Sequence, residues 1–300
     1  MPGTDELAHA AEIIRRGGLV AFPTETVYGL GANALDHQAL RRIYKAKGRP
    51  ESSPLIVHVA DIDMAKSLTT EWPGLADTLA DCFWPGPLTI VLHKAQCVPD
   101  LATAGLSSVG VRVPAHPVAL ELIRLANVPI AAPSANRFTQ LSPTTADHVR
   151  SGLGNSVDLI LDGGPTDVGI ESTVASLTSE QPIVLRPGII SVEDLRAATG
   201  VSWATLDPAQ VSSESPGLHP KHYAPRTPLF LLRNGDPIPA GRGRVIKMPR
   251  ELRAYTQSLY ASMHRADAEG WDWIAIEEPP DTPEWAAIRD RLTRASQTTG

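Results

Sequence analysis

Two cations, Lys47 and Arg49, stand a few residues before the apolar run at 55–57 in a chain whose formal net charge is −6. They close a group of positive charges that begins at residue 41. One interpretation is a solvated helix end, because positive charge in the last turn offsets the helix dipole and exposed cations need no special function. The other is a local phosphate site, since an acidic chain is unsuited to gripping nucleic-acid backbone over a wide surface.

Two further side chains that could bind a ligand, Arg112 and His58, lie on predicted strands. In SSVGVRVP, the alternation of a strand places Arg112 opposite a row of core-facing valines. Its guanidinium can then offer a planar fork to a carboxylate or a phosphate. The same alternation in PLIVHVA places His58 on the side of Ile56. A lone histidine on a strand is more often structural than functional, so both interpretations of His58 stay open.

Hydroxyl and amide side chains recur where other strands end. Ser134 and Asn136 follow the apolar run VPIAA, and Ser142 stands just before a predicted helix start, where free N–H groups favour anions. Arg186 precedes a segment in which Ser191 and Asp194 form a capping-box pattern. The sequence contains no GxxxxGK[ST] loop and no GxGxxG. Together, these positions indicate a basic cleft for a small polyanionic ligand.

The elements that must position these residues alternate along the chain between strand-like and helix-like segments. This alternation predicts an α/β or α+β domain around a twisted sheet. One helix is expected to begin at Thr4 as its N-cap, and another at Asp36. Strands are expected at GLVAFPT, PLIVHV, LTIVLH, SVGVRVP, VPIAAPS, DLILDG, STVASL and PIVLRPG.

The chain divides into three parts by composition. Residues 1–204 form the main domain, and residues 205–227 are polar and proline-rich, which predicts a loop between domains. Residues 228–300 predict a small C-terminal α/β domain. No run approaches the roughly 18 apolar residues of a membrane helix, and the first residues lack the pattern of a signal peptide. Two cysteines without CxxC spacing argue against a structural zinc and against a disulfide framework, which suits a reducing compartment. We therefore expect a cytoplasmic protein with no membrane contact.

The motifs resemble those of the YrdC-like threonylcarbamoyl-AMP synthases in their order and approximate spacing. The matching segments are FPTETVYGLG (22–31), KAKGRPESSPLIVH (45–58), VGVRVPAHP (109–117), APSAN (132–136), ESTV (171–174), LRPG (185–188) and SPGLHPKHYAP (215–225). The last segment and the C-terminal part resemble the two-domain branch of the family. The resemblance implies a twisted mixed sheet with flanking helices, a concave basic cleft covered by the loop at 205–227, and a small C-terminal α/β domain.

The resemblance also implies an ATP-dependent nucleotidyltransferase. L-threonine and bicarbonate would form N-carboxy-threonine, whose carboxylate attacks the α-phosphate of ATP and gives L-threonylcarbamoyl-AMP and pyrophosphate. Mg²⁺ would arrive with ATP, and no protein ligand for it is assigned, since such transfer needs positioning and charge neutralisation more than a protein nucleophile. The product would pass to a downstream threonylcarbamoyl transferase that modifies tRNAs reading ANN codons. Direct binding of tRNA stays open.

The resemblance carries over to individual residues. The implied threonine pocket consists of Thr26, His58, Arg112, Ala132 and Ser172. The implied ATP contacts are Arg49, Ser53, Ser108, Ser134, Ser142, Arg186 and Tyr223. The implied catalytic set is Lys47, Arg49, Ser134 and Asn136. Glu171 is open between an Mg²⁺-linked role and a structural one. Ser53 departs from the asparagine frequent in the family, which shortens its reach, and LHPK replaces more basic or aromatic residues in the loop.

Two other functions fit the wider fold. A double-stranded RNA-binding module needs an extended basic face, which the acidic composition disfavours. A carbamoyl-transfer enzyme of this fold would adenylate carbamoyl phosphate, but such proteins carry a zinc-finger part that two cysteines cannot supply. The synthase is therefore the favoured interpretation.

Overall fold

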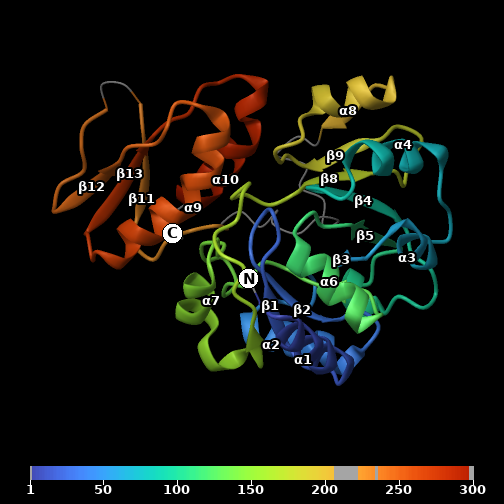
Figure 1. The fold of residues 1–300 in the computed structure, drawn as a ribbon. Helices are drawn as coiled ribbons and strands as arrows, with labels where there is room; N and C mark the ends of the chain where they lie inside the picture. The colour runs from blue at the N-terminus through green and yellow to red at the C-terminus, as the bar shows by residue number, and fades with distance from the viewer. Residues whose placement is uncertain (1, 206–221, 234–235, 297–300) are drawn as a thin grey trace.

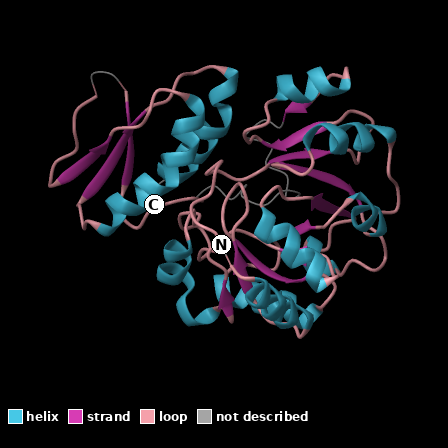
Figure 2. Cartoon of the chain, viewed as in Figure 1, coloured by secondary structure: helices cyan, strands magenta, loops and turns pink. Residues whose placement is uncertain are grey.

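A computed structural model describes residues 2–205, 222–233 and 236–296, so most of the predicted interdomain loop, including His219, lies outside the described residues. The described part contains two sheets, each covered by helices (Figures 1 and 2). Among these helices, none is long and apolar enough to cross a lipid bilayer.

The larger sheet has ten strands and mixed directions. Its strands are β1 (Val20–Phe22), β2 (Gly29–Asn33), β3 (Ile56–His58), β4 (Leu88–His93), β5 (Ser108–Arg112), β6 (Ile130–Ala131), β7 (Leu159–Ile160), β8 (Thr173–Ser176), β9 (Ile183–Arg186) and β10 (Ala204–Thr205). They lie in the order β10-β9-β8-β4-β5-β3-β6-β2-β1-β7. For example, β5 runs parallel to β3 and antiparallel to β4. The predicted mixed sheet is therefore confirmed.

Helices flank this sheet and bury apolar side chains against it. They are α1 (Thr4–Arg15), α2 (His37–Lys47), α3 (Ile62–Ser67), α4 (Gly74–Phe83), α5 (Asp100–Thr103), α6 (Pro117–Ala126), α7 (Ala146–Leu153), η1 (Gly154–Ser156) and α8 (Val192–Thr199). The predicted cap of α2 is confirmed, because the Asp36 carboxylate accepts from two backbone N–H groups. The predicted cap at Thr4 is wrong: Gly3 is the N-cap, and no side chain caps α1.

Side-chain alternation places β3 and β5 as the sequence predicts. Val57 and Val111 join one core cluster with residues of α2, whereas Ile56 packs on the opposite face. Strand β2 was not expected from the GLGAN segment. Gly31 is required there because a Cβ at this position would lie 2.6 Å from the ring of Phe22 on β1.

The smaller sheet holds the C-terminal part. Its strands are β11 (Leu229–Leu232), β12 (Gly243–Ile246) and β13 (Trp273–Glu277), and its helices are α9 (Leu252–Ala268), η3 (Pro283–Trp285) and α10 (Ala286–Ser296). All pairings are parallel, in the order β11-β13-β12. Leu259 and Ile288 belong to a core cluster that also contains Val27 and Leu141 of the first part. The C-terminal helices thus pack directly against the larger domain.

Candidate active site

A buried cavity of about 50 Å³ lies where β3, β6 and the segment before β8 approach the end of the predicted loop. Among the residues that line it are predicted ligands of both substrates: Thr26, Arg49, His58, Arg112, Ala132, Ser134, Ser172, Arg186 and Tyr223. The sheet register explains part of this convergence, because His58 on β3 pairs with Arg112 on β5. Residues that sequence reasoning did not assign also line it: Thr24, Val27, Gly29, Ile56, Pro133 and His222.

Arg112 is held by three partners and keeps one free nitrogen. Its Nε donates to the carbonyl of Gly86 at 3.0 Å. Its Nη2 donates to Glu25 at 2.6 Å and to the Thr26 hydroxyl at 3.1 Å. Nη1 has no hydrogen bond to any residue that the structure describes. The guanidinium is therefore fixed in orientation with donors left for an anion.

His58 lies beside this arginine as a neutral imidazole. Burial, and then the charge of Arg112, lowers the pKa of His58 to about 3. Its Nδ1 is buried and has no hydrogen-bond partner among the described residues. The ring meets Phe22 edge-on, with centroids 6.3 Å apart. A buried nitrogen without a partner is costly, which favours a ligand role for His58 over a purely structural one.

Lys47 and Arg49 are both buried, so the solvated helix end does not describe them. The Nζ of Lys47 donates to the carbonyls of Ser134 at 2.5 Å and Asn136 at 2.6 Å. Burial, and then the charge of Arg49, lowers its pKa well below the usual range. A neutral amine can still donate both bonds. Lys47 therefore fixes the turn at 134–136 and does not line the cavity.

Arg49 does line the cavity. Its Nη2 donates to the carbonyl of Pro54 at 3.0 Å, while its buried Nε has no partner among the described residues. Its guanidinium carbon lies 5.8 Å from the ring centre of Phe138. Burial lowers the pKa of Arg49 to about 10, which leaves it charged at neutral pH. It is thus a second fixed cation, on the side of Ser134.

Arg186 is the third cation of the cavity. Its Nε and Nη2 both donate to the carbonyl of Ser172, at 3.1 and 2.9 Å, and Nη2 also donates to the Ser172 hydroxyl at 3.1 Å. That hydroxyl lies 2.9 Å from the Thr89 hydroxyl on β4. Ser172 is therefore held between strands β4 and β9 at the cavity wall.

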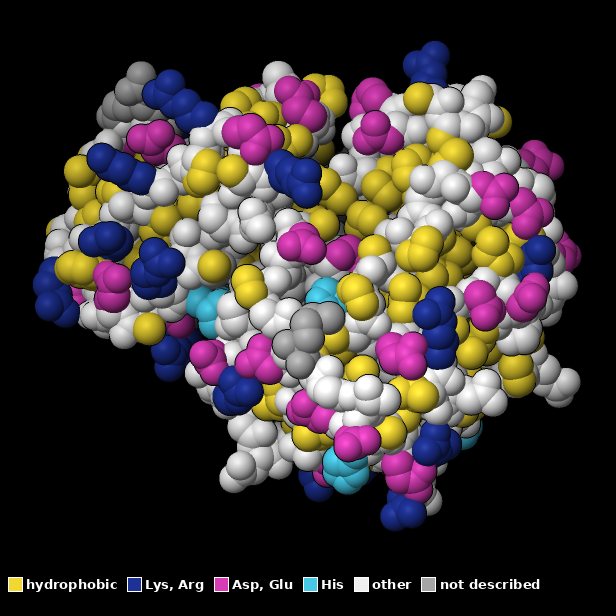
Figure 3. Space-filling view, in the orientation of Figure 1, with side chains coloured by type: hydrophobic (Ala, Val, Ile, Leu, Met, Phe, Trp, Pro, Cys, Tyr) yellow, Lys and Arg dark blue, Asp and Glu magenta, His cyan; other side chains and the backbone are white. Residues whose placement is uncertain are grey.

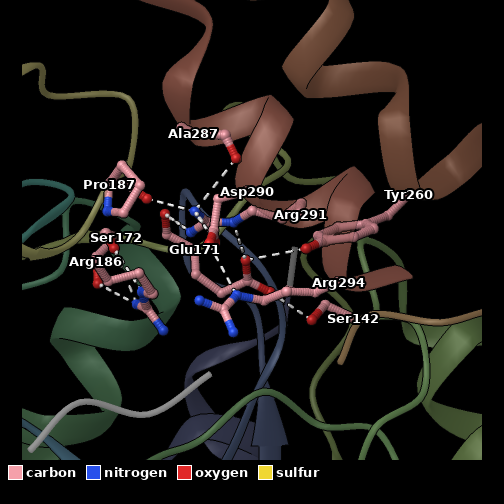
Figure 4. A network of polar contacts seen from close by, with 10 residues as sticks. All are labelled: Ser142, Glu171, Ser172, Arg186, Pro187, Tyr260, Ala287, Asp290, Arg291 and Arg294. Carbon is pink, nitrogen blue, oxygen red and sulfur yellow. Dashed lines mark hydrogen bonds and ion pairs between the residues drawn. The ribbon is translucent and has the colours of Figure 1, made fainter. Parts of the chain in front are cut away.

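Glu171 stands at the centre of a buried network that joins the two domains (Figure 4). Its carboxylate accepts from Ser142 at 2.5 Å, from Tyr260 at 3.1 Å and from Arg291 at 3.2 Å. Arg291 is fully buried and also donates to the carbonyls of Glu171 and Pro187. These contacts support the structural interpretation of Glu171, because both of its carboxylate oxygens are already engaged.

The end of the interdomain loop reaches the cavity through Tyr223. Its hydroxyl is buried without a partner among the described residues, and burial raises its pKa to about 12. The Arg291 guanidinium carbon lies 5.5 Å from its ring centre. The backbone N–H of His222 donates to the carbonyl of Arg294 on α10 at 3.3 Å. The C-terminal helix thus supports this wall of the cavity.

The structure does not bring every predicted residue into the cavity. Asn136 lines a separate cavity of about 290 Å³ that includes His148 and His264. Ser108 lines another of about 10 Å³, and Ser53 lies half-buried in a turn. The helix predicted just after Ser142 is present as α7, with Thr145 as its N-cap, but Ser142 does not line the cavity. Its hydroxyl is instead directed to Glu171.

Three important partners, Glu25, Arg291 and Tyr260, were not predicted from the sequence. Glu25, which holds Arg112, lies within FPTETVYGLG but was not assigned a role. The sequence did contain a reason to look for it, because a buried arginine such as Arg112 needs a nearby carboxylate. Arg291 and Tyr260 carried no usable signal, because their partner Glu171 is 120 and 89 positions away along the chain.

Known proteins match this chain over nearly its whole length. The family model for Sua5, YciO and YrdC proteins, described as "Telomere recombination", matches residues 12–188. A model described as "Threonylcarbamoyl-AMP synthase, C-terminal domain" matches residues 190–297. The chain belongs to the Sua5/YciO/YrdC family, in the branch that carries this C-terminal domain.

Similar individual proteins agree with this placement. The threonylcarbamoyl-AMP synthase of Pyrococcus abyssi is 48% identical, over 96% of this chain and 93% of its own length. That of Bacillus subtilis is 41% identical, over 97% and 93% respectively. The crystal structure of P. abyssi Sua5 complexed with L-threonine is 37% identical with a TM-score of 0.91, and covers 99% of this chain and 95% of that chain. The resemblance drawn from the short motifs is confirmed.

Proposed function

We propose that this chain synthesises L-threonylcarbamoyl-AMP and pyrophosphate from ATP, L-threonine and bicarbonate. The observation that carries the proposal is the cavity lined by Arg49, Arg112 and Arg186 together with the hydroxyls of Thr26 and Ser172. Relatives of nearly the same length bear the name of this activity. Three fixed cations with hydroxyl donors suit a carboxylate and phosphates, and the reaction requires both.

Threonine is assigned to the end of the cavity at Arg112. The free Nη1 of Arg112 would bind the carboxylate of the amino acid, with Thr26 beside it. The neutral His58 offers a buried nitrogen to a polar group of the same ligand. Ala132 and Ser172 form the neighbouring walls. This assignment uses the donors that the described protein contacts leave unused.

ATP is assigned to the end at Arg49, Ser134 and Arg186. Threonine nitrogen and bicarbonate form a carbamate with loss of water, and a carbamate oxygen then attacks the α-phosphorus. The bond to the β-phosphate oxygen breaks, and pyrophosphate leaves. Arg49 and Arg186 would neutralise charge that develops on the phosphates, so the protein contributes position and charge and no nucleophile. The cavity of about 50 Å³ is smaller than a nucleotide, so ATP binding must open it or extend beyond it.

We propose that Mg²⁺ enters with ATP. The residues that the structure describes include no group of three His, Cys, Asp or Glu side chains that could hold a metal ion. Glu171, which lines the cavity, already accepts from three donors. Phosphate oxygens and water suit Mg²⁺ as ligands. When bound, the ion would supply charge neutralisation on the phosphates.

Pyrophosphate release tests the proposal. The purified full chain is incubated with Mg-ATP, L-threonine and bicarbonate, and pyrophosphate is measured with a coupled assay. We expect release that requires both threonine and bicarbonate, and that falls at least tenfold in Arg49→Ala while the far-ultraviolet circular dichroism is unchanged. Pyrophosphate release at the same rate without threonine would contradict the proposal.

We further propose that the reaction takes place in the cytoplasm and that the product passes to a tRNA-modifying transferase.

A further inference from the structure

The C-terminal domain carries a groove that the proposed reaction does not use. A cavity of about 480 Å³ lies at the carboxyl ends of β12 and β13, between the segment that leads into α9 and the residues after β13. A second cavity, of about 360 Å³, lies beside it between β12 and α9. Val245, Ile246 and Lys247 line both cavities, which together are called the β12 groove.

The larger cavity of the β12 groove lies at a position where proteins bind ligands. The smaller cavity flanks β12 and the C-terminal turn of α9. Open sheets with parallel strands bind small molecules beyond the carboxyl ends of their strands, because the connecting loops diverge there. All strand pairs of this sheet are parallel. Both cavities also lie within the range of roughly 300–1,000 Å³ that small-molecule sites occupy.

Four cations of the β12 groove have no protein partner for their charge. Arg244, Lys247, Arg250 and Arg265 line it, and their charged groups make no hydrogen bond or ion pair within the part of the chain that the structure describes. The cations of this domain that pair with carboxylates are Arg233, Arg289, Arg291 and Arg294. Figure 3 shows Lys and Arg side chains over the C-terminal sheet, at the left of the view.

The carboxylates of the groove do not cancel this charge. Glu269 accepts from the indole N–H of Trp271 at 2.6 Å, and Glu278 pairs with Arg233 at 2.9 Å. Glu277 has no hydrogen bond from its side chain among the described residues. Because the indole N–H is neutral, Glu269 keeps its negative charge, as does Glu277. The groove therefore presents four unpaired cations against two carboxylates without a cationic partner.

The larger cavity has an aromatic floor of two buried side chains, Tyr255 at 4% and Trp285 at 8% exposure, which present only their edges to it. Tyr255 and Trp285 both line it, with ring centroids 5.2 Å apart at 90°. The Tyr255 hydroxyl is buried without a partner in the described part of the chain. Burial, and then the charge of Glu277, raises its pKa, so it stays protonated and can donate. Met248, Pro279 and Pro280 complete an apolar wall suited to a flat ring.

We propose that the β12 groove binds a nucleotide, with its base in the larger cavity against Met248, Pro279 and Pro280 and its phosphate among the cations at 244, 247 and 265. A purely apolar ligand would leave these cations unused, and inorganic phosphate alone would leave the aromatic cavity empty. The nucleotide can be free or part of a single-stranded RNA, because both present the same base and phosphate.

Two fluorescent probes test this site in the full chain: N-methylanthraniloyl-GMP and a short end-labelled single-stranded RNA. Fluorescence anisotropy should detect binding of at least one, and the double variant Lys247→Ala/Arg265→Ala should weaken it about tenfold or more. Arg253→Ala is the matched control, because Arg253 is an exposed cation of the same helix α9 that lies outside both cavities. Tyr255→Phe, which removes only the hydroxyl, should weaken binding less. For RNA, the logarithm of affinity should fall with the logarithm of salt concentration by about 0.7 per neutralised phosphate.

The outcomes separate the sources and the alternatives. Binding of both probes assigns the site to free nucleotides, and binding of the RNA alone assigns it to a strand. Binding should persist in Arg49→Ala, which alters only the catalytic cavity, and Lys247→Ala/Arg265→Ala should keep its pyrophosphate release. No binding of either probe, or an equal loss in Arg253→Ala, would overturn the proposal without touching the proposed reaction.

Discussion

Substitution of Arg291 should show that the C-terminal domain stabilises the catalytic cavity through Glu171. Arg291→Met keeps the length of the side chain but removes its bonds to the Glu171 carboxylate and to the carbonyls of Glu171 and Pro187. The carboxylate would remain buried with only Ser142 and Tyr260 as donors. Removing one partner of a buried ion pair costs about 3–5 kcal/mol. We expect a loss of that size in the free energy of unfolding.

A double-mutant cycle isolates the pair from other losses. Glu171→Gln/Arg291→Met removes both charges, so it should be about 2 kcal/mol more stable than the sum of the two single losses predicts. Urea unfolding followed by tryptophan fluorescence measures all four proteins. Arg289→Met is the control on the same helix, because the partners of Arg289, the Asp281 carboxylate and the carbonyls of Pro280 and Thr282, are exposed and return to water when it is removed. It should cost clearly less than Arg291→Met, about 1–2 kcal/mol. Losses that add within about 0.5 kcal/mol would refute the proposed coupling.

Three further predictions concern the cavity and its surroundings. Arg112→Lys should raise the KM for threonine about tenfold or more, with a smaller change in kcat. The reason is that an ammonium cannot hold both Glu25 and a ligand carboxylate in the fixed geometry of a guanidinium. An unchanged KM in steady-state kinetics would contradict the assignment of threonine to Arg112. Lys47→Met should lower both kcat and the free energy of unfolding, because Lys47 holds the turn at 134–136. An unchanged free energy of unfolding together with lost activity would instead indicate that Lys47 contacts the substrate directly. Acidification should destabilise the protein, because burial lowers the pKa of His148 to about 4 and stability present above pH 6.5 is lost as the pH falls towards 4. Since His148 is partly exposed, its share is well below about 1.4 kcal/mol per pH unit. His58 titrates in the same range, so His148→Gln should reduce the slope in urea titrations at several pH values without abolishing it.

Local patterns in the sequence predicted much of the fold and the cavity. The alternation of β3 and β5 correctly placed Arg112 and His58 away from the main core, because side chains of a strand alternate whatever the tertiary context. The caps at Asp36 and Ser191 were likewise predicted, since they depend on neighbouring backbone groups alone. Strand alternation and helix caps can therefore be predicted from a few neighbouring residues.

Other features depend on contacts that the sequence does not announce. Lys47 was predicted to face phosphate, but it donates to a turn that lies 87 and 89 positions further along the chain. Ser142 was predicted as an ATP contact just before a helix, and α7 does follow it, but its hydroxyl donates to Glu171, 29 positions further along the chain. The coupling of Glu171 to Arg291 arises from domain packing, which no local pattern encodes.

The most direct test of the proposed reaction follows the carbon of bicarbonate. The full chain is incubated with Mg-ATP, L-threonine and carbon-13 bicarbonate, and the nucleotide products are separated and weighed by mass spectrometry. The proposed reaction predicts a threonylcarbamoyl adenylate that carries the heavy carbon and is absent when threonine is omitted. A folded protein that yields only unlabelled nucleotides, or an adenylate of threonine without the extra carbon, would contradict it.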